Sequence, residues 1–294
     1  MAAQYHGAME AATTTVADER LHRIQQAVKW TVYTLLLVNF GYYIVEDTIR
    51  AAHTLTAQST FLDWTTNFAV TIDESAWFIL LFMFELETYA LSDEALEGWV
   101  ERLLRGVRLA CFVMIAHTIY AYTNSVITLL PTVQVEDATR LCDLSDQDLS
   151  FVYNLEYTDI TQETCDGLSS ATEFYRVGND PVVTDMAGLN LERQLAWADI
   201  YEGVAWLLAL LAIEMVVRLQ DRGVTGGALM QSAKWGKNFL YLSILGVGVH
   251  WATLSHWLYL WDEILWIGGF MAIDMNLSEW RKEMLEEEVA AVQA

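Results

Sequence analysis

The stretch DEILWIGGFMAID, residues 262–274, places a carboxylate at each end of an apolar run. Its pattern is an acid, three residues, a tryptophan, seven residues and a second acid, and the same pattern occurs three times in the chain. The three copies are Asp73, Trp77 and Glu85; Glu202, Trp206 and Glu214; and Asp262, Trp266 and Asp274. We call this pattern the acidic frame, its first acid the outer acid and its second acid the inner acid.

Helical geometry gives the acidic frame a definite shape. Four residues turn an α-helix by about 400°, so the outer acid and the tryptophan lie one turn apart on nearly the same face. Twelve residues rise about 18 Å and bring the inner acid back to the same broad side. A charged side chain inside a bilayer costs at least about 2.5 kcal/mol. We therefore expect Glu85, Glu214 and Asp274 to face protein or water rather than lipid.

The apolar residues favour a membrane protein. Of the 294 residues 54% are hydrophobic, and only two are prolines. Apolar runs of bilayer length lie near residues 30–49, 68–91, 108–131, 197–220, 237–256 and 260–280. The sequence therefore predicts an all-α polytopic membrane protein with six transmembrane helices, in which the tryptophans of the acidic frames also suit an interfacial aromatic belt.

A shared downstream spacing supports an internal repeat. Glu85 precedes Arg108 by 23 residues, and Glu214 precedes Lys237 by the same 23 residues. Together with the three acidic frames, this spacing predicts three repeated two-helix hairpins in a parallel repeat with pseudo-threefold symmetry.

The basic residues predict the orientation. With the N-terminus inside, twelve of the sixteen basic residues fall in cytoplasmic segments, and four fall outside. Residues 1–28 lack the apolar core of a cleavable signal peptide, so we expect the first apolar helix to act as an uncleaved anchor. The predicted location is a prokaryotic inner (cytoplasmic) membrane, with several passes and with both termini cytoplasmic.

Five segments follow from these assignments. They are a cytoplasmic N-terminal segment with an amphipathic lead-in helix (1–28), the first hairpin and third transmembrane helix (29–131), an acidic extracytoplasmic cap (132–196), transmembrane helices four to six (197–283) and a cytoplasmic acidic tail (284–294). The cap holds 13 acidic residues against 3 arginines. Cys142 and Cys165 both fall in it, where an oxidising compartment favours a disulfide, and GNDP at 178–181 marks a turn.

The net charge of −23 excludes a nucleic-acid-binding surface, which needs clustered Lys and Arg, and matches cations better as ligands. An acidic, Lys-poor surface is equally typical of proteins from salty water. The chain contains no HExxH, GxSxG, Walker A or dinucleotide-binding motif, so we do not expect an enzyme.

Rings of carboxylates around a threefold axis are typical of cation pathways. The first hypothesis is therefore a pathway for protons or monovalent cations through the outer and inner acids, with His117 as a proton relay near the depth of the inner acids. The competing interpretation of the inner acids is structural ion pairing, since Arg218 follows Glu214 by one helical turn.

Two further hypotheses stay open. The chain is alternatively a non-transporting scaffold or sensor subunit that engages partner proteins, as a homo-oligomer or within a membrane complex. Less favoured is a b-haem redox subunit in which His117 and His250, both near mid-membrane, clamp the haem.

Overall fold

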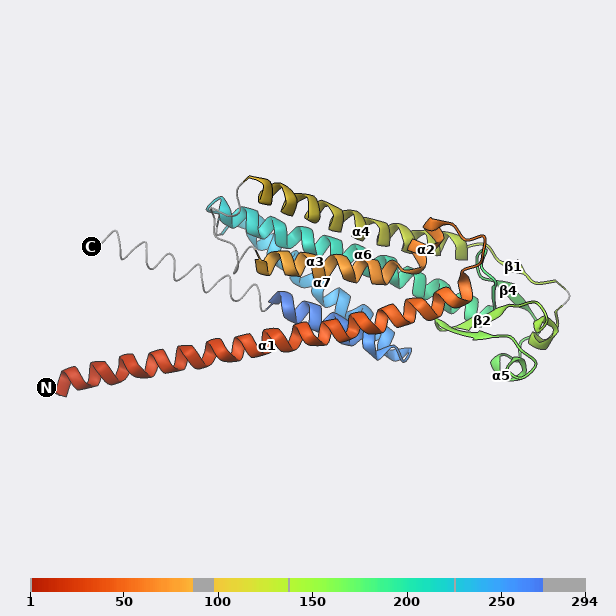
Figure 1. Ribbon diagram of the computed structural model, residues 1–294, viewed down its shortest axis with the longest axis horizontal. Helices are drawn as coiled ribbons and strands as arrows, with labels where there is room; N and C mark the ends of the chain where they lie inside the picture. The colour runs from red at the N-terminus through yellow and green to blue at the C-terminus, as the bar shows by residue number, and fades with distance from the viewer. Residues whose placement is uncertain (1, 87–97, 137, 225, 272–294) are drawn as a thin grey trace. The chain divides into compact units, whose positions relative to one another are not determined.

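The computed structural model describes residues 2–86, 98–136, 138–224 and 226–271 (Figure 1). The chain divides into two compact units, one of residues 40–247 and the other of residues 1–39 and 248–294. The helices are α1 (Ala2–Thr54), α2 (Phe61–Asn67), α3 (Ala69–Glu85), α4 (Trp99–Leu129), α5 (Cys165–Leu168), α6 (Met186–Asp221) and α7 (Ala228–Thr253), with a further helix over 257–271.

The described part of the chain is mostly helical, and two of its helices, α4 and α6, are long and apolar enough to cross a membrane. A third span results if α2 and α3, which are bent by 69° at their junction, form one broken span. Among the described residues α1 and α7 fall short of this standard, because polar side chains such as Asn39 and Lys237 interrupt their apolar runs. The predicted membrane protein is therefore supported, whereas six spans and a threefold repeat stay predictions.

The predicted lead-in helix is continuous with the helix predicted to be the first membrane span. No glycine or proline occurs between Gly7 and Gly41 to end it, and α1 accordingly runs unbroken from Ala2 to Thr54. Helix α4 likewise begins at Trp99 and carries its basic residues directly into its apolar run.

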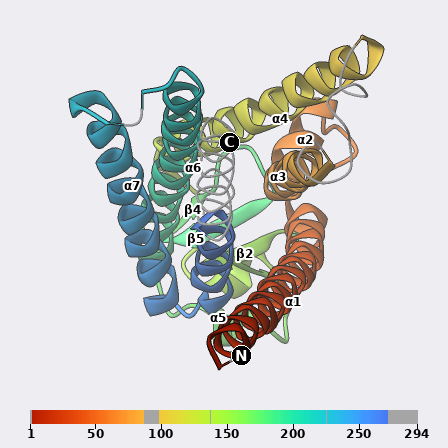
Figure 2. The same ribbon diagram turned by 90° about the vertical axis from the view of Figure 1, so that its left-hand side faces the viewer.

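Three helices of the 40–247 unit pack together. Helix α4 contacts both α3 and α6, and the views of Figures 1 and 2 agree that the three lie side by side. At the far end of α6, the buried side chains of Val216, Met230 and Ala233 join α6 to α7.

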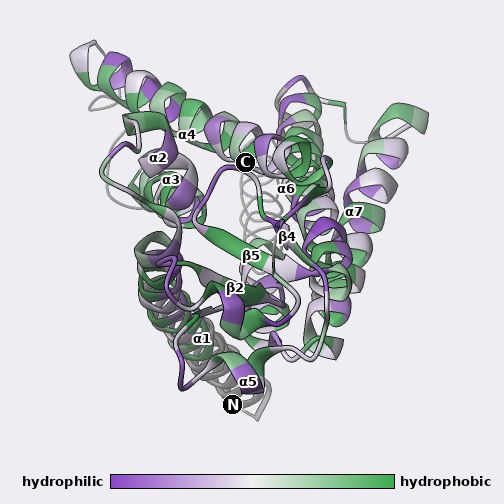
Figure 3. Ribbon diagram, turned by 90° about the vertical axis from the view of Figure 1, so that its right-hand side faces the viewer, coloured by the Kyte–Doolittle hydropathy of each residue, from purple (hydrophilic) through white to green (hydrophobic). Residues whose placement is uncertain are grey.

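The cap departs from the all-α prediction, because it contains a five-stranded sheet in the order β1-β4-β5-β2-β3. The strands are β1 (Val133–Gln134), β2 (Ser150–Tyr153), β3 (Glu156–Asp159), β4 (Phe174–Arg176) and β5 (Val182–Asp185), with a 3-10 helix η2 (Leu141–Leu144). Strands β2 and β5 pair in parallel, and the other pairs are antiparallel. Seen from this end, β2 and β5 are coloured as hydrophobic, between largely hydrophilic loops (Figure 3).

The cap has its own hydrophobic core, in which Leu141, Phe151 and Phe174 are buried. The predicted disulfide between Cys142 and Cys165 is present. The predicted turn at GNDP joins β4 to β5; Gly178 has a φ of +59°, and the Val177 amide donates to the Val182 carbonyl at 3.0 Å.

The cap is anchored on α4 and α6. Helix α6 starts at Met186 rather than at the predicted 197, so it extends from the apolar region into the cap. Arg193 of α6 caps the end of α4, since its Nε donates to the Leu129 carbonyl at 2.7 Å and its Nη2 to the Leu130 carbonyl at 2.9 Å. A buried cluster that includes Val126, Tyr175 and Leu189 covers the same junction.

In the second unit, α7 and the helix over 257–271 meet at a tight corner. Ser255 has a φ of 76°, and the His256 amide donates to the Trp251 carbonyl at 3.0 Å, which ends α7 in the manner of a Schellman motif. The two helices come so close at Gly248 that a Cβ there would lie 3.2 Å from the Leu260 Cα.

Candidate functional site

The structure brings together the outer acids of two acidic frames. Asp73 of α3 and Glu202 of α6 lie close enough to repel each other electrostatically. The tryptophans of the same two frames also meet, with the ring centroids of Trp77 and Trp206 5.8 Å apart. The first and second acidic frames therefore converge within the 40–247 unit.

The spacing within the first frame has a direct chemical role. The Trp77 indole Nε1 donates a hydrogen bond of 3.0 Å to the Asp73 Oδ2, one helical turn away. Asp73 is thus held by Trp77, and the orientation of its carboxylate is fixed relative to α3.

Two residues that sequence analysis missed complete the group. Tyr122 of α4 interacts electrostatically with Asp73, Asp199 and Glu202, and Asp199 also repels Glu202. Gly203 of α6 packs against the tyrosine, since a Cβ at this position would lie in ordinary contact with the Tyr122 Cδ2, at 3.4 Å. We call Asp73, Tyr122, Asp199 and Glu202 the carboxylate cluster. Asp199 was detectable in the sequence, since it precedes Glu202 by three residues and shares its helix face.

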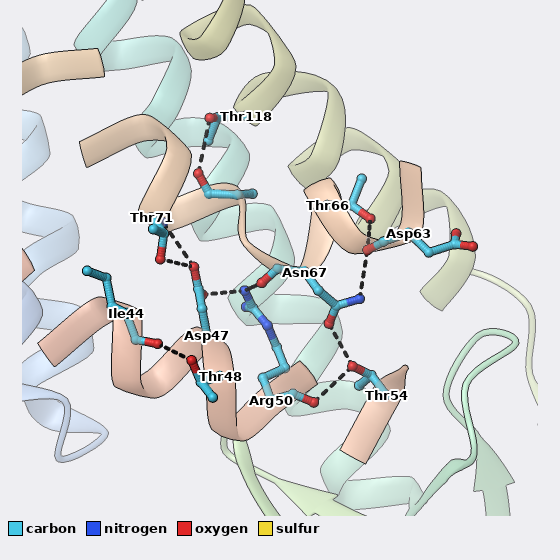
Figure 4. Close-up of polar contacts among 11 residues, drawn as sticks. Ile44, Asp47, Thr48, Arg50, Thr54, Asp63, Thr66, Asn67, Thr71 and Thr118 are labelled. Carbon is cyan, nitrogen blue, oxygen red and sulfur yellow. Dashed lines mark hydrogen bonds and ion pairs between the residues drawn. The ribbon is translucent and has the colours of Figure 1, made fainter. Parts of the chain in front are cut away.

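Next to this cluster, the helix break between α2 and α3 is held by two residues of α1 (Figure 4). Asp47 accepts hydrogen bonds from the Thr71 amide at 2.9 Å and from the Thr71 hydroxyl at 2.8 Å. Arg50 donates to the Asn67 carbonyl at 2.5 Å and to the Asp47 Oδ1 at 2.6 Å. A carboxylate thus sits at the N-terminus of α3 and a guanidinium at the C-terminus of α2, as the helix dipoles favour.

Threonine side chains support the same break. Thr54 bridges the end of α1 and α2, because its hydroxyl lies 2.6 Å from the Asn67 Oδ1 and 2.8 Å from the Arg50 carbonyl and can donate its one proton to either. From α4, the buried Thr118 hydroxyl donates to the Ala69 carbonyl at 3.3 Å. Both helix ends that the break creates therefore have partners outside their own helix.

Arg50 also acts beyond the break. Its charge attracts Asp199 of the carboxylate cluster and Asp180 in the turn between β4 and β5. Burial, together with repulsion by Asp63 of α2, raises the pKa of Asp180 to about 6, although Arg50 opposes the rise. Arg50 therefore faces acids from α1, α6 and the cap.

The raised pKa of Asp180 predicts a pH-dependent cap. The folded state favours the protonated acid, so Asp180 contributes stability that is present below pH 4 and is lost as the pH rises through 6. We expect Asp180→Asn to slow amide hydrogen exchange in β4 and β5 at pH 7.5, by a free-energy change on the order of 2 kcal/mol, and to leave it almost unchanged at pH 4. Glu163→Gln, at an exposed cap acid, is the control; an equal effect of both variants would contradict the assignment.

The inner acids behave differently from one another. Glu214 is exposed, and Arg218 donates to it at 2.7 Å, so the ion pairing considered for it is present. Glu85 is partly buried at the end of α3, and Asp274 lies outside the described residues. The ring of inner acids stays a prediction.

The third acidic frame belongs to the other unit. Asp262 is buried there and accepts a hydrogen bond of 2.9 Å from the Asn39 Nδ2. Trp266 is buried as well and stacks on Phe270 at 6.0 Å. Asp262 and Trp266 of the third frame are thus both buried inside protein.

The two histidines of the haem hypothesis lie in different units. His117 of α4 stacks on Tyr120 with ring centroids 6.0 Å apart, and its buried Nε2 has no hydrogen-bond partner among the described residues. His250 of α7 lies with its ring centroid 6.5 Å from that of Trp251. Haem binding stays a prediction.

No protein-family model, curated protein or solved structure matches this chain. Among the described residues, one set of side chains has ligand atoms close enough together to hold a metal ion: Cys142, Cys165 and Asp166. Its two sulfurs are joined in the disulfide, so they are not thiolate ligands. The carboxylate cluster is accordingly the candidate site from which we infer a function.

Proposed function

We propose that this protein forms a pathway for protons or monovalent cations across a prokaryotic inner membrane. The observation that carries the proposal is the convergence of Asp73 and Glu202, from two copies of the same acidic frame, beside Tyr122 and Asp199. These residues lie on α4 and α6, which are long and apolar enough to cross a membrane, and on α3, which reaches that length only together with α2 as one broken span. Ionisable groups in such segments are functional by default.

The chemistry of the cluster suits proton transfer. Carboxyl groups and a phenol can donate and accept protons in turn, and repulsion between neighbouring carboxylates favours a shared proton. His117 lies five residues before Tyr122 on α4, about 7 Å along the helix axis, and extends the series of titratable groups toward the inner acids. The acidic cap raises the local concentration of cations at the entrance.

The architecture that we propose for this pathway keeps six spans in three repeated hairpins, with both termini cytoplasmic. Two acidic frames that meet through their outer acids and tryptophans support the repeat. The third frame, with its buried Asp262 and Trp266, is the remaining member of the repeat in this proposal.

The cap favours a second candidate function, that of a sensor or scaffold subunit. It has its own buried core, a five-stranded sheet and a disulfide, as an extracytoplasmic recognition module has. In this case its acidic surface would engage a partner protein and the carboxylate cluster would be structural.

Purified protein in liposomes separates the two functions. With a pH-sensitive dye inside the vesicles and a potassium diffusion potential as the driving force, a pathway carries protons faster than protein-free vesicles do. Flux at the protein-free level, for protons and for Na⁺ and K⁺, would overturn the pathway and favour the sensor. A Soret band in the same preparation would support the haem alternative.

A further inference from the structure

The position of Arg50 points to the ion that the pathway carries. Its Nη2 bonds to the Asp47 Oδ1 and to the Asn67 carbonyl, and its side chain is 31% exposed. Asp47 is itself fixed by two bonds from Thr71, and its side chain is 3% exposed. The guanidinium is therefore held at the helix break from both sides (Figure 4).

This fixed cation lies among acids that would otherwise attract metal ions. It acts on Asp199 of the carboxylate cluster and on Asp180 of the cap. A guanidinium remains charged at every pH that proteins tolerate, so it is a permanent positive charge next to the cluster. Both oxygens of Asp47 already accept hydrogen bonds, one from Arg50 and the other from Thr71, so a metal ion would have to compete with these donors.

We propose that Arg50 makes the pathway selective for protons over Na⁺ and K⁺, an inference that rests on the proposed pathway. The positive charge of Arg50 raises the free energy of a metal ion in the cluster, although its ion pair with Asp47 reduces the effect. A metal ion also needs several free oxygen ligands to replace its water. A proton needs no such oxygen ligands, because it moves by transfer from a carboxyl or phenol group to the next carboxylate.

The test compares fluxes of protons, Na⁺ and K⁺ through proteoliposomes that carry wild-type protein or Arg50→Gln. Glutamine retains a donor for the Asn67 carbonyl but carries no charge. We expect the variant to keep proton flux within about threefold of wild type and to pass Na⁺ or K⁺ at least about tenfold faster. Arg50→Lys, which keeps the charge, should remain selective.

Arg140→Gln is the matched control. Arg140 also pairs with an aspartate three positions away, Asp143 at 3.3 Å, but it is exposed in the cap and should not affect selectivity. A folded Arg50→Gln variant that conducts protons and still excludes Na⁺ and K⁺ overturns the inference.

The wild type gives an independent test that does not depend on the folding of a variant. If it passes Na⁺ or K⁺ as fast as protons, Arg50 does not confer selectivity and the inference is wrong. If the wild type passes no protons, the proposed pathway itself is wrong, whatever the role of Arg50. Proton flux without metal-ion flux is the expected result for the wild type.

Discussion

Proteoliposomes that carry the double variant Asp73→Asn, Glu202→Gln are expected to show no more proton flux than protein-free vesicles. The two carboxylates come from different helices and act on each other, so the proposed pathway makes them adjacent proton-binding groups. An amide has nearly the same shape as a carboxyl group but does not bind and release a proton near neutral pH. Each single variant should reduce flux by at least about tenfold, in the range of a removed acid–base group.

The control for this experiment is Glu101→Gln. Glu101 is an exposed acid of α4 that pairs with Arg105 one turn away, so its replacement also removes one carboxylate from a helix of the same unit. We expect wild-type flux from it. Near-wild-type flux from the double variant, in protein with normal thermal stability, would show that the cluster is structural and would remove the main support for a pathway.

The helical part of the fold was predictable because bilayer-length apolar runs depend only on local composition. The cap sheet was not, since its strands have two to four residues and lie within a polar segment. Their pairing joins distant residues, such as Val133 with Arg176, and no local alternation marks them.

The helix break was unpredictable for a similar reason. Residues 59–70 contain neither glycine nor proline, the usual markers of a broken helix. Asp47 and Arg50 of α1 bind the ends of α2 and α3, and their sequence positions give no indication of those partners. The 69° bend therefore coincides with tertiary contacts from α1 and not with a helix-breaking residue in the local sequence.

The candidate site was predictable in part. The acidic frame in the sequence singled out Asp73 and Glu202, which the structure brings into interaction. The same frame did not include Tyr122, which reaches the cluster from α4 beside Gly203. Nor did it distinguish the inner acids, of which Glu214 is exposed and ion-paired with Arg218.

The largest loss of stability is expected from Asp47→Ala. Asp47 is 2% exposed and accepts hydrogen bonds from Arg50 and from the amide and hydroxyl of Thr71. Removing one partner of a buried ion pair costs about 3–5 kcal/mol, because the other charge loses its counter-ion while still partly buried. The exposed pair of Glu101 with Arg105 gives the comparison, since Glu101→Ala should cost less than about 1 kcal/mol.

Denaturation in detergent micelles measures the loss of stability, and hydrogen exchange of the amides at the start of α3 shows where the stability is lost. Asp47→Asn should cost less than Asp47→Ala, because the amide oxygen still accepts from Thr71. The double variant Asp47→Ala, Arg50→Ala should cost less than the sum of its single variants, because it leaves no uncompensated guanidinium. Two results would contradict this expectation: equal losses of stability for Asp47→Ala and Glu101→Ala, or strict additivity in the double variant. Either would show that the break between α2 and α3 persists without this ion pair. Its geometry would then come from Thr54, Thr118 and the packing of α4.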